Sequence, residues 1–204
     1  MRDKYKYCGE EKRYLETNDL FFKFHISKRE FLQEIRGYKI SKQSNLPVPD
    51  LETIGYSKKS LGFKKIRYQR FDQYLRDEKF DFTRRLNVVS NCARLIAKLH
   101  RESLVFAPPN YNLQYERLVR LQRDLCHFGN IPKKTAEKAI TQISRKLNDF
   151  SAISPFCSFI HGDFIPQNLF YNGKNKLIIF DWENSCDSDP MYDLACFISF
   201  VFVI

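Results

Sequence analysis

The stretch that decides the fold of this chain is HGDFIPQNLFYNGKNKLIIFD, residues 161–181. In its second half, apolar runs at 169–171 and 177–180 flank Asn172 and Gly173. An Asn-Gly pair between two apolar runs is a strong signal for a β-hairpin, because both residues tolerate the positive φ angles of a tight turn. The sequence therefore predicts a two-stranded antiparallel ribbon that is entered through a loop.

Three polar side chains belong to the same end of this predicted hairpin. Asp163 and Asn168 precede the first strand, and Asp181 directly follows the second. Because a tight hairpin brings these two ends together, we expect two carboxylates and one carboxamide to converge. Hard oxygen donors of this kind suit Mg²⁺, and a differently placed carboxylate can accept a proton from an attacking hydroxyl group. The cluster is therefore typical of phosphoryl transfer.

Composition indicates a globular protein and favours an anionic partner. Of the 204 residues, 43% are hydrophobic and 15% aromatic, and the formal net charge is +10. Such a balance suits a nucleotide, a phosphorylated substrate, nucleic acid or an acidic membrane surface. No zinc-finger, basic-zipper or RNA-binding pattern accompanies it, so we expect no nucleic acid partner. The sequence has no P-loop and no G-x-G-x-x-G motif, which removes support for other nucleotide-binding folds.

The cysteines and the chain ends bear on the compartment. None of the six cysteines forms a C-x-x-C pair, and four of them lie in apolar runs, which is typical of reduced thiols in a cytoplasmic protein. The N-terminus has no apolar signal segment. Residues 194–204 are almost wholly apolar but too short for a membrane span of about 20 residues. We interpret them as a buried helix whose continuation is missing, and expect a chain shortened at its C-terminus.

The first 70 residues alternate between short segments. Runs at 12–17 and 20–26 predict a hairpin, and runs at 51–56 and 63–71 predict two further strands. Between them, Ser27 begins an S-x-x-E capping box that marks the start of a helix, which two prolines then end. Connections this short favour an antiparallel sheet with one helix packed on it.

The rest of the chain is mainly helical in pattern. Apolar residues at helical spacing predict helices at 83–100, 113–128 and 136–150. Asp189 and Pro190 predict the start of a last helix, with the proline at its first position.

The loop and hairpin carry a resemblance. H-x-D-x-x-x-x-N followed by a hairpin and an Asp resembles the catalytic loop of kinase-like folds. Together with IIFDWE at 178–183 and DPMYDLA at 189–195, it is similar to the aminoglycoside phosphotransferase and choline kinase-like family. The resemblance implies an α+β, two-lobed protein kinase-like fold. An N-terminal nucleotide-binding lobe of small antiparallel sheet plus helix would span residues 1–70, and a mainly helical C-terminal lobe would span residues 71–204.

The resemblance also implies roles for the polar residues of the loop. Asp163 would be the catalytic base, and Asn168 and Asp181 would be Mg²⁺ ligands. His161 would brace the loop, and Asp193 would tie the last helix to it.

A nucleotide site is implied in the first lobe. The family carries a Lys on the third strand and a Glu on the following helix, for which Lys23 and Glu34 fit. Glu30 is the other candidate, but it already belongs to the capping box. Adenine would lie at the junction between the lobes, near Gln69 to Phe71, held by backbone groups.

The implied function is transfer of the γ-phosphoryl group of ATP, with Mg²⁺, to a hydroxyl group of a small molecule. Aminoglycoside, amino alcohol and sugar acceptors all remain open. Ile165 stands where a protein kinase would carry Lys, and residues 181–193 are too few for its activation segment, so a small molecule is favoured over a protein.

Basic positions in the middle helices bear on the acceptor. They favour an anionic acceptor such as a phosphosugar or lipid-linked glycan, although a solvated helical face also explains them. These positions are Arg117, Arg120, Arg123, Lys133, Lys134, Lys138, Arg145 and Lys146.

The sequence departs from the family at both ends. The loop that covers the phosphates would be residues 8–10, with Gly9 as its single glycine, after a short strand at 4–8. Helices that complete an acceptor pocket do not follow residue 204. An inactive, truncated remnant or a nucleotide-binding scaffold is therefore the alternative function.

Overall fold

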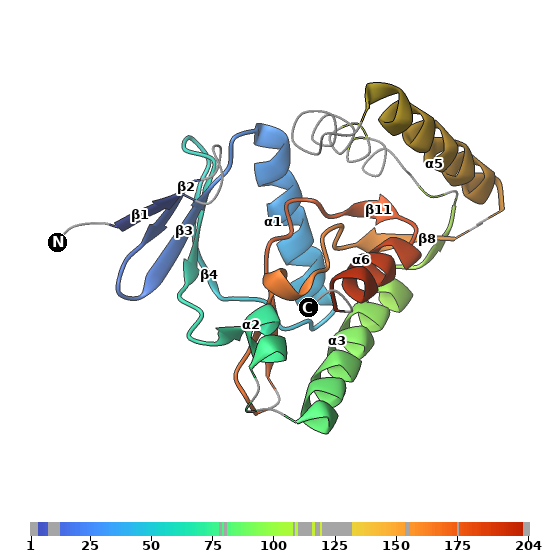
Figure 1. The fold of residues 1–204 in the computed structure, drawn as a ribbon. Coiled ribbons are helices and arrows are strands. Elements are labelled where there is room, and N and C mark those ends of the chain that lie inside the picture. Colours follow the sequence, from blue (N-terminus) through green and yellow to red (C-terminus); the bar gives the residue numbers. More distant parts are fainter. Residues whose placement is uncertain are drawn as a thin grey trace.

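The computed structural model describes residues 4–7, 13–77, 79, 81–107, 109, 116, 119, 132–153, 156–174 and 176–201. The described chain is an α+β protein of two lobes, as predicted, and in Figure 1 the sheet of the first lobe lies at the left with the helices to its right. Among the described helices, none combines the length and the apolar character that crossing a membrane requires.

The first lobe is built on a five-stranded antiparallel sheet. Its strands follow the order β1-β2-β3-β5-β4. The predicted hairpin of the second and third strands is confirmed. The strands are β1 (Lys4–Tyr7), β2 (Arg13–Glu16), β3 (Leu20–Phe24), β4 (Leu51–Gly55) and β5 (Ser60–Lys64). Residues 8–10, the predicted phosphate-covering loop, lie outside the described residues.

Helix α1 (Lys28–Gln43) packs on this sheet. It begins at the predicted capping box, where the Glu30 backbone nitrogen donates to the Ser27 side chain at 3.0 Å and the Ser27 nitrogen donates to the Glu30 carboxylate at 3.4 Å. One face of α1 forms a buried cluster with the sheet, composed of Phe31, Ile35, Leu61 and Phe63.

The second lobe combines helices with two small sheets, β10-β9-β6 and β11-β8-β7. The predicted hairpin is confirmed as β9 and β10, in which Leu177 pairs with Tyr171. The elements are β6 (Gln69–Arg70), α2 (Phe71–Arg76), α3 (Phe82–Glu102), β7 (Val105–Phe106), α5 (Lys133–Ile153), β8 (Phe156–Ile160), η1 (Pro166–Asn168), β9 (Leu169–Tyr171), β10 (Leu177–Ile179), β11 (Cys186–Ser188) and α6 (Met191–Val201).

The helix predictions of this lobe have three outcomes. The predictions at 83–100 and 136–150 are confirmed as α3 and α5, each a few residues longer. The prediction at 113–128 lies outside the described residues apart from two isolated positions. Helix α6 begins at Met191, one residue later than predicted, and the Met191 nitrogen donates to Asp189 Oδ1 at 2.9 Å.

The strand predicted at 63–71 is wrong. The chain forms β5, leaves the first sheet after Lys64, and pairs again as β6 with β9 of the second lobe. Helix α2 then begins at once. The apolar side chains of this run serve two different cores, because Phe63 packs in the first lobe and Phe71 in the second. A single strand could not reach both.

The two lobes approach closely where α1 passes the segment after the hairpin. A β-carbon at Gly37 would lie 2.6 Å from the Ser185 hydroxyl oxygen and 2.7 Å from the Trp182 β-carbon. The Ser185 hydroxyl also donates to the Gln33 carbonyl of α1 at 3.3 Å. Glycine therefore permits α1 to contact the polypeptide that carries Asp181.

Candidate active site

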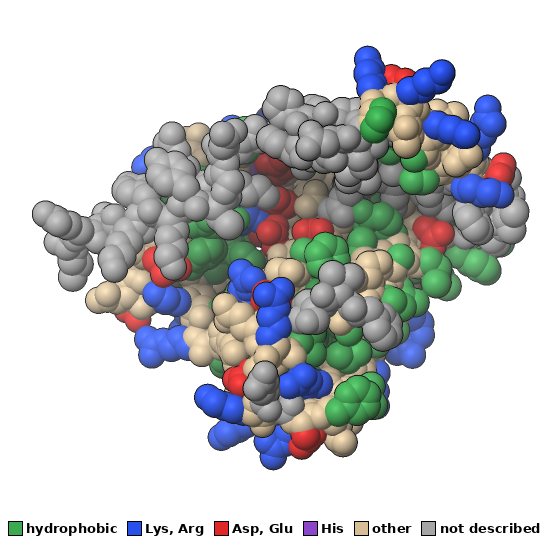
Figure 2. Space-filling view, in the orientation of Figure 1, with side chains coloured by type: hydrophobic (Ala, Val, Ile, Leu, Met, Phe, Trp, Pro, Cys, Tyr) green, Lys and Arg blue, Asp and Glu red, His purple; other side chains and the backbone are tan. Residues whose placement is uncertain are grey.

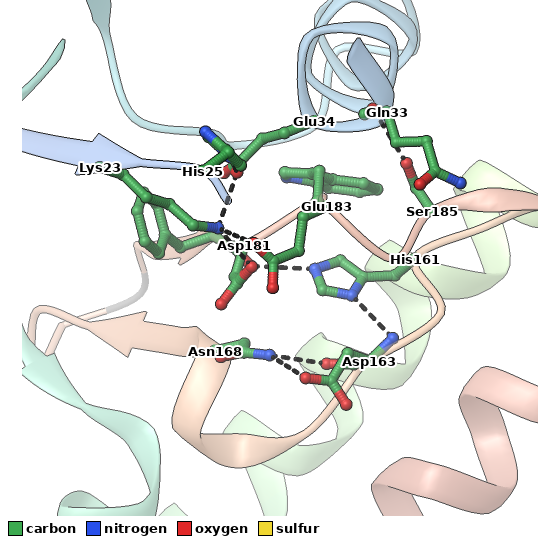
Figure 3. Close-up of polar contacts among 12 residues, drawn as sticks. Lys23, His25, Gln33, Glu34, His161, Asp163, Asn168, Asp181, Glu183 and Ser185 are labelled. Carbon is green, nitrogen blue, oxygen red and sulfur yellow. Dashed lines mark hydrogen bonds and ion pairs between the residues drawn. The ribbon is translucent and has the colours of Figure 1, made fainter. Parts of the chain in front are cut away.

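A buried lysine lies at the centre of the polar cluster between the lobes (Figure 3). Lys23 on β3 is fully buried, and its Nζ donates to Glu34 Oε2 at 2.7 Å and to Asp181 Oδ1 at 2.6 Å. Burial alone would lower the pKa of Lys23, but the carboxylates of Asp181 and Glu34 outweigh it and raise that pKa above the ordinary value. Lys23 is therefore an ammonium ion, and the predicted contact with Glu34 is present.

Two members of this cluster were not predicted from the sequence. Glu183 Oε2 lies 2.9 Å from Lys23 Nζ, and His25 Nε2 contacts Glu34 Oε2. A signal exists for His25, which follows Lys23 by two positions at the end of β3, whereas the left-handed backbone at Asp181 means that the spacing of Glu183 gives no such signal. In an extended chain, residues two apart point to the same side.

The loop that carries His161 and Asp163 is held by a buried carboxylate from α6. Asp193 is fully buried, and it accepts hydrogen bonds from the backbone nitrogens of His161 at 2.7 Å and Gly162 at 2.8 Å. The His100 ring nitrogen Nε2 also lies 2.9 Å from Asp193 Oδ2. Gly162 has a φ of 76°, a left-handed conformation that favours glycine. The predicted tie between the last helix and the loop is confirmed.

His161 joins the loop to the segment that carries Asp181. Its Nε2 lies 2.9 Å from the Phe180 carbonyl oxygen, and its Nδ1 lies 3.2 Å from the Asp163 backbone nitrogen. A carbonyl only accepts and a backbone N–H only donates, so Nε2 carries the ring hydrogen and Nδ1 is the acceptor. His161 is thus a neutral brace between the two halves of the site.

Asp163 and Asn168 form a hydrogen-bonded pair below Asp181 in the view of Figure 3. Asn168 Nδ2 donates to the Asp163 carbonyl at 2.9 Å and to Asp163 Oδ2 at 3.0 Å. The Phe180 nitrogen donates to the Asn168 carbonyl at 2.9 Å, which connects the hairpin ends as predicted. Asp181 has a φ of 69°, a strained conformation that aspartate tolerates better than most residues.

The oxygen atoms of this cluster fit a magnesium ion. Because the Asn168 amide nitrogen faces Asp163, its Oδ1 is directed to the other side. The side chain of Asp181 is 17% exposed and can be reached from solvent. A carboxamide oxygen and a carboxylate are hard donors of the type that Mg²⁺ prefers, with water and phosphate oxygens completing its shell.

A cavity of about 120 Å³ lies at the junction of the lobes. Aromatic rings and the segment after β5 line it: Glu16, Phe21, Phe63, Lys64, Lys65, Ile66, Phe170 and Phe180. The predicted adenine residues lie further along the chain. Gln69 is an exposed residue of β6, and Phe71 is fully buried in the core of the second lobe.

The family follows from a comparison with protein-family models. A model described as the phosphotransferase enzyme family (APH) matches residues 12–204, nearly the whole chain. The chain belongs to this phosphotransferase family. No curated protein sequence matches it.

Solved structures share the fold of this phosphotransferase at low sequence identity. A choline/ethanolamine kinase family protein from Mesorhizobium loti is 16% identical, with a TM-score of 0.68 over 97% of this chain and 63% of its own. A choline kinase from Streptococcus pneumoniae is also 16% identical, with a TM-score of 0.65 over 98% of this chain and 69% of its own. An aminoglycoside-3'-phosphotransferase of type VIII is 15% identical, with a TM-score of 0.67 over 97% of this chain and 77% of its own. The phosphotransferase therefore spans about two thirds to three quarters of the length of these structures.

Proposed function

We propose that this chain is an ATP- and Mg²⁺-dependent kinase that transfers the γ-phosphoryl group to a hydroxyl group of a small molecule. The observation that carries the proposal is the convergence of Lys23, from the first lobe, with Asp181 and the Asp163–Asn168 pair of the second. These groups supply the cation, the metal ligands and the base that phosphoryl transfer requires.

Each of these side chains has a part in the proposed reaction. Asp163 orients the acceptor hydroxyl group and takes its proton. Lys23 binds the phosphates of ATP, and Glu34 holds its ammonium group in place. Asn168 and Asp181 hold Mg²⁺, which when bound neutralises phosphate charge. His161 acts as a positioning residue, because it joins the loop of Asp163 to the carbonyl that precedes Asp181.

Adenine is proposed to occupy the cavity between the lobes. The aromatic side chains that line the cavity can stack on a flat heterocycle, and the backbone of residues 64–66 can form hydrogen bonds with it. Gln69 remains a candidate at the edge of the site. Phe71 could contribute only backbone atoms, because its side chain is enclosed.

The acceptor is proposed to be a small molecule of the aminoglycoside, amino alcohol or sugar type. The names of similar structures, an aminoglycoside phosphotransferase and a choline kinase, support this range. The idea of an anionic acceptor rests on basic residues whose first three lie outside the described part. Those on α5 are exposed, and Figure 2 shows their charges on the outer side of the molecule, with acidic side chains nearer its centre. We also propose a cytoplasmic location, which the free cysteines among the described residues suit.

The test is Mg²⁺-dependent ATP turnover by the purified chain beside Asp163→Asn. We expect the variant to be about 10²- to 10⁴-fold slower, the usual contribution of a positioned base. Asp187→Asn is the matched control, because Asp187 is exposed and pairs only at the surface with Arg36. If Asp163→Asn turned over ATP as fast as the wild type, Asp163 would not be the catalytic base. No Mg²⁺-dependent turnover in the wild type would support an inactive remnant.

A further inference from the structure

His25 is a buried histidine next to the lysine of the active site. It directly follows β3, and its side chain is fully enclosed. Its Nδ1 lies 3.1 Å from the carbonyl oxygen of Lys59. Its Nε2 contacts Glu34 Oε2, the same oxygen to which Lys23 donates. The other oxygen of Glu34 is buried and has no hydrogen-bond partner among the described residues, so His25 and Lys23 together anchor this carboxylate.

The two partners of His25 determine its protonation. A carbonyl oxygen can only accept a hydrogen bond, and so can an ionised carboxylate. A neutral imidazole carries one N–H and would leave a lone pair facing one of these oxygens. A proton on Glu34 Oε2 could satisfy His25, but the Lys23 ammonium already donates to that oxygen and favours its ionised form. Both contacts are satisfied only when both ring nitrogens carry hydrogen.

We infer that His25 is an imidazolium that positions Glu34, so that Lys23, Glu34 and His25 form one unit that orders the ammonium group for ATP. His25 is a positioning residue, because it acts on the phosphates only through Glu34 and Lys23. The inference rests on the proposed function, and it adds to it a residue that orders the proposed ATP-binding lysine through Glu34.

The surrounding charges favour the protonated ring. Glu34 faces it from α1, and Glu183 faces it from the segment after Asp181. Lys23 is the cation of its own strand, and it already pairs with three carboxylates. On the side of the β4–β5 turn, the Lys59 ammonium donates to the Ile26 carbonyl. Three carboxylates around a single buried ammonium leave an excess of negative charge, which an imidazolium reduces.

A metal ion is the competing occupant of this place. Donor atoms of His25, Glu34 and Glu183 lie within 4.8 Å of one another, as ligands of a transition metal would. However, Lys23 Nζ lies 2.7 Å from Glu34 Oε2 and 2.9 Å from Glu183 Oε2, so an ammonium already occupies the position of the cation. An imidazolium also has no lone pair to offer a metal.

The first test is the ring ¹⁵N spectrum of His25, which needs no activity. The signals are assigned by their disappearance in His25→Gln. We expect both nitrogens to be protonated at pH 7, because each faces an oxygen that accepts a hydrogen bond. A neutral ring at pH 7 overturns the inference. Loss of the His25 signals at one equivalent of Zn²⁺, absent in Glu183→Gln, overturns it in favour of a metal site.

The second test is the split of kcat/KM for ATP into its two parameters at pH 7. His25→Gln replaces the charged donor to Glu34 with a neutral one, so kcat/KM should be about tenfold lower, mainly through a higher KM. Lys42→Gln, which removes an exposed cation from α1, the helix that carries Glu34, should retain the wild-type kcat and KM.

The outcomes separate this inference from the proposed function. A wild-type KM for ATP in His25→Gln overturns the role of the imidazolium while leaving the kinase intact. If no variant and no wild-type protein turns over ATP, the proposed function fails, and the ¹⁵N spectrum still decides the charge of His25. His25→Phe, which removes both donors, should be weaker in ATP binding than His25→Gln, and equal binding by the two variants contradicts the anchoring of Glu34.

Discussion

Asp193→Asn is the substitution that most directly tests how the loop of Asp163 is held. The native carboxylate is fully buried and contacts three donors through its two oxygens. Oδ2 accepts hydrogen bonds from the His161 backbone nitrogen and the His100 ring nitrogen Nε2, and Oδ1 accepts one from the Gly162 backbone nitrogen. The amide of Asn offers a single acceptor oxygen, so it can replace only one of these two positions.

The expected magnitude follows from which bonds survive. The amide oxygen will take the Oδ2 position and retain two contacts, while its NH₂ group faces the N–H of Gly162. A hydrogen bond to a charged group contributes about 1.5–3 kcal/mol, and an unsatisfied buried donor costs about 1–3 kcal/mol. Because these two figures overlap, we expect the free energy of unfolding to fall by about 2–4 kcal/mol. For a protein of this size, that lowers Tm by roughly 5–12 °C.

The assay is urea unfolding followed by circular dichroism, with calorimetry for Tm. Asp187→Asn is the control, since its pair with Arg36 is about half exposed on both sides and should contribute under about 1 kcal/mol. ATP turnover of Asp193→Asn should also fall, because the Gly162 nitrogen, directly before Asp163, loses its acceptor. A loss of less than about 1 kcal/mol, or a loss equal to that of the control, would refute the account of the loop.

Three further outcomes follow from the packing and from the pKa shifts. Gly37→Ala should lower the unfolding free energy by about 1 kcal/mol, because overpacking against Trp182 (about 1–3 kcal/mol) outweighs the gain in helix propensity (about 1 kcal/mol); a more stable variant in urea would contradict it. Arg70 holds the pKa of the buried Asp72 carboxyl below its usual range, so this pair stabilises the fold above about pH 4 and ceases to do so as pH falls through the lowered pKa. Because Arg70 is 44% exposed, Arg70→Met should destabilise by only about 1 kcal/mol at pH 7, and a difference that does not shrink as pH falls through the lowered pKa of Asp72 would argue against the pair. Burial raises the pKa of the Cys92 thiol, so a thiol reagent at pH 8 should modify it only in urea, and equal labelling of native and unfolded protein would show that it is accessible.

Local patterns predicted the elements that support the site. The capping box at Ser27, the hairpin turn at Asn172 and the loop from His161 all depend on neighbours within a few residues, and each forms where the sequence indicates. The Lys23–Glu34 contact was also predicted, because strand and helix are adjacent in sequence and family resemblance singled out the pair. The strand predicted at 63–71 was wrong, because the apolar residues of that run pack in the cores of two different lobes.

By itself, the sequence singled out the residues that we propose carry the chemistry: the acid and amide of the loop, the acid after the hairpin and the lysine of the first lobe. Only the tertiary structure decided what surrounds that lysine. Asp181 is 158 positions from Lys23, and Glu183 joins the cluster only when α1 packs against the second lobe across Gly37, whereas His25 joins it when α1 packs on the first sheet. The physical reason is that short-range signals set backbone conformation, whereas the charge and protonation of a buried group depend on every partner that the packing of two lobes brings within hydrogen-bonding distance.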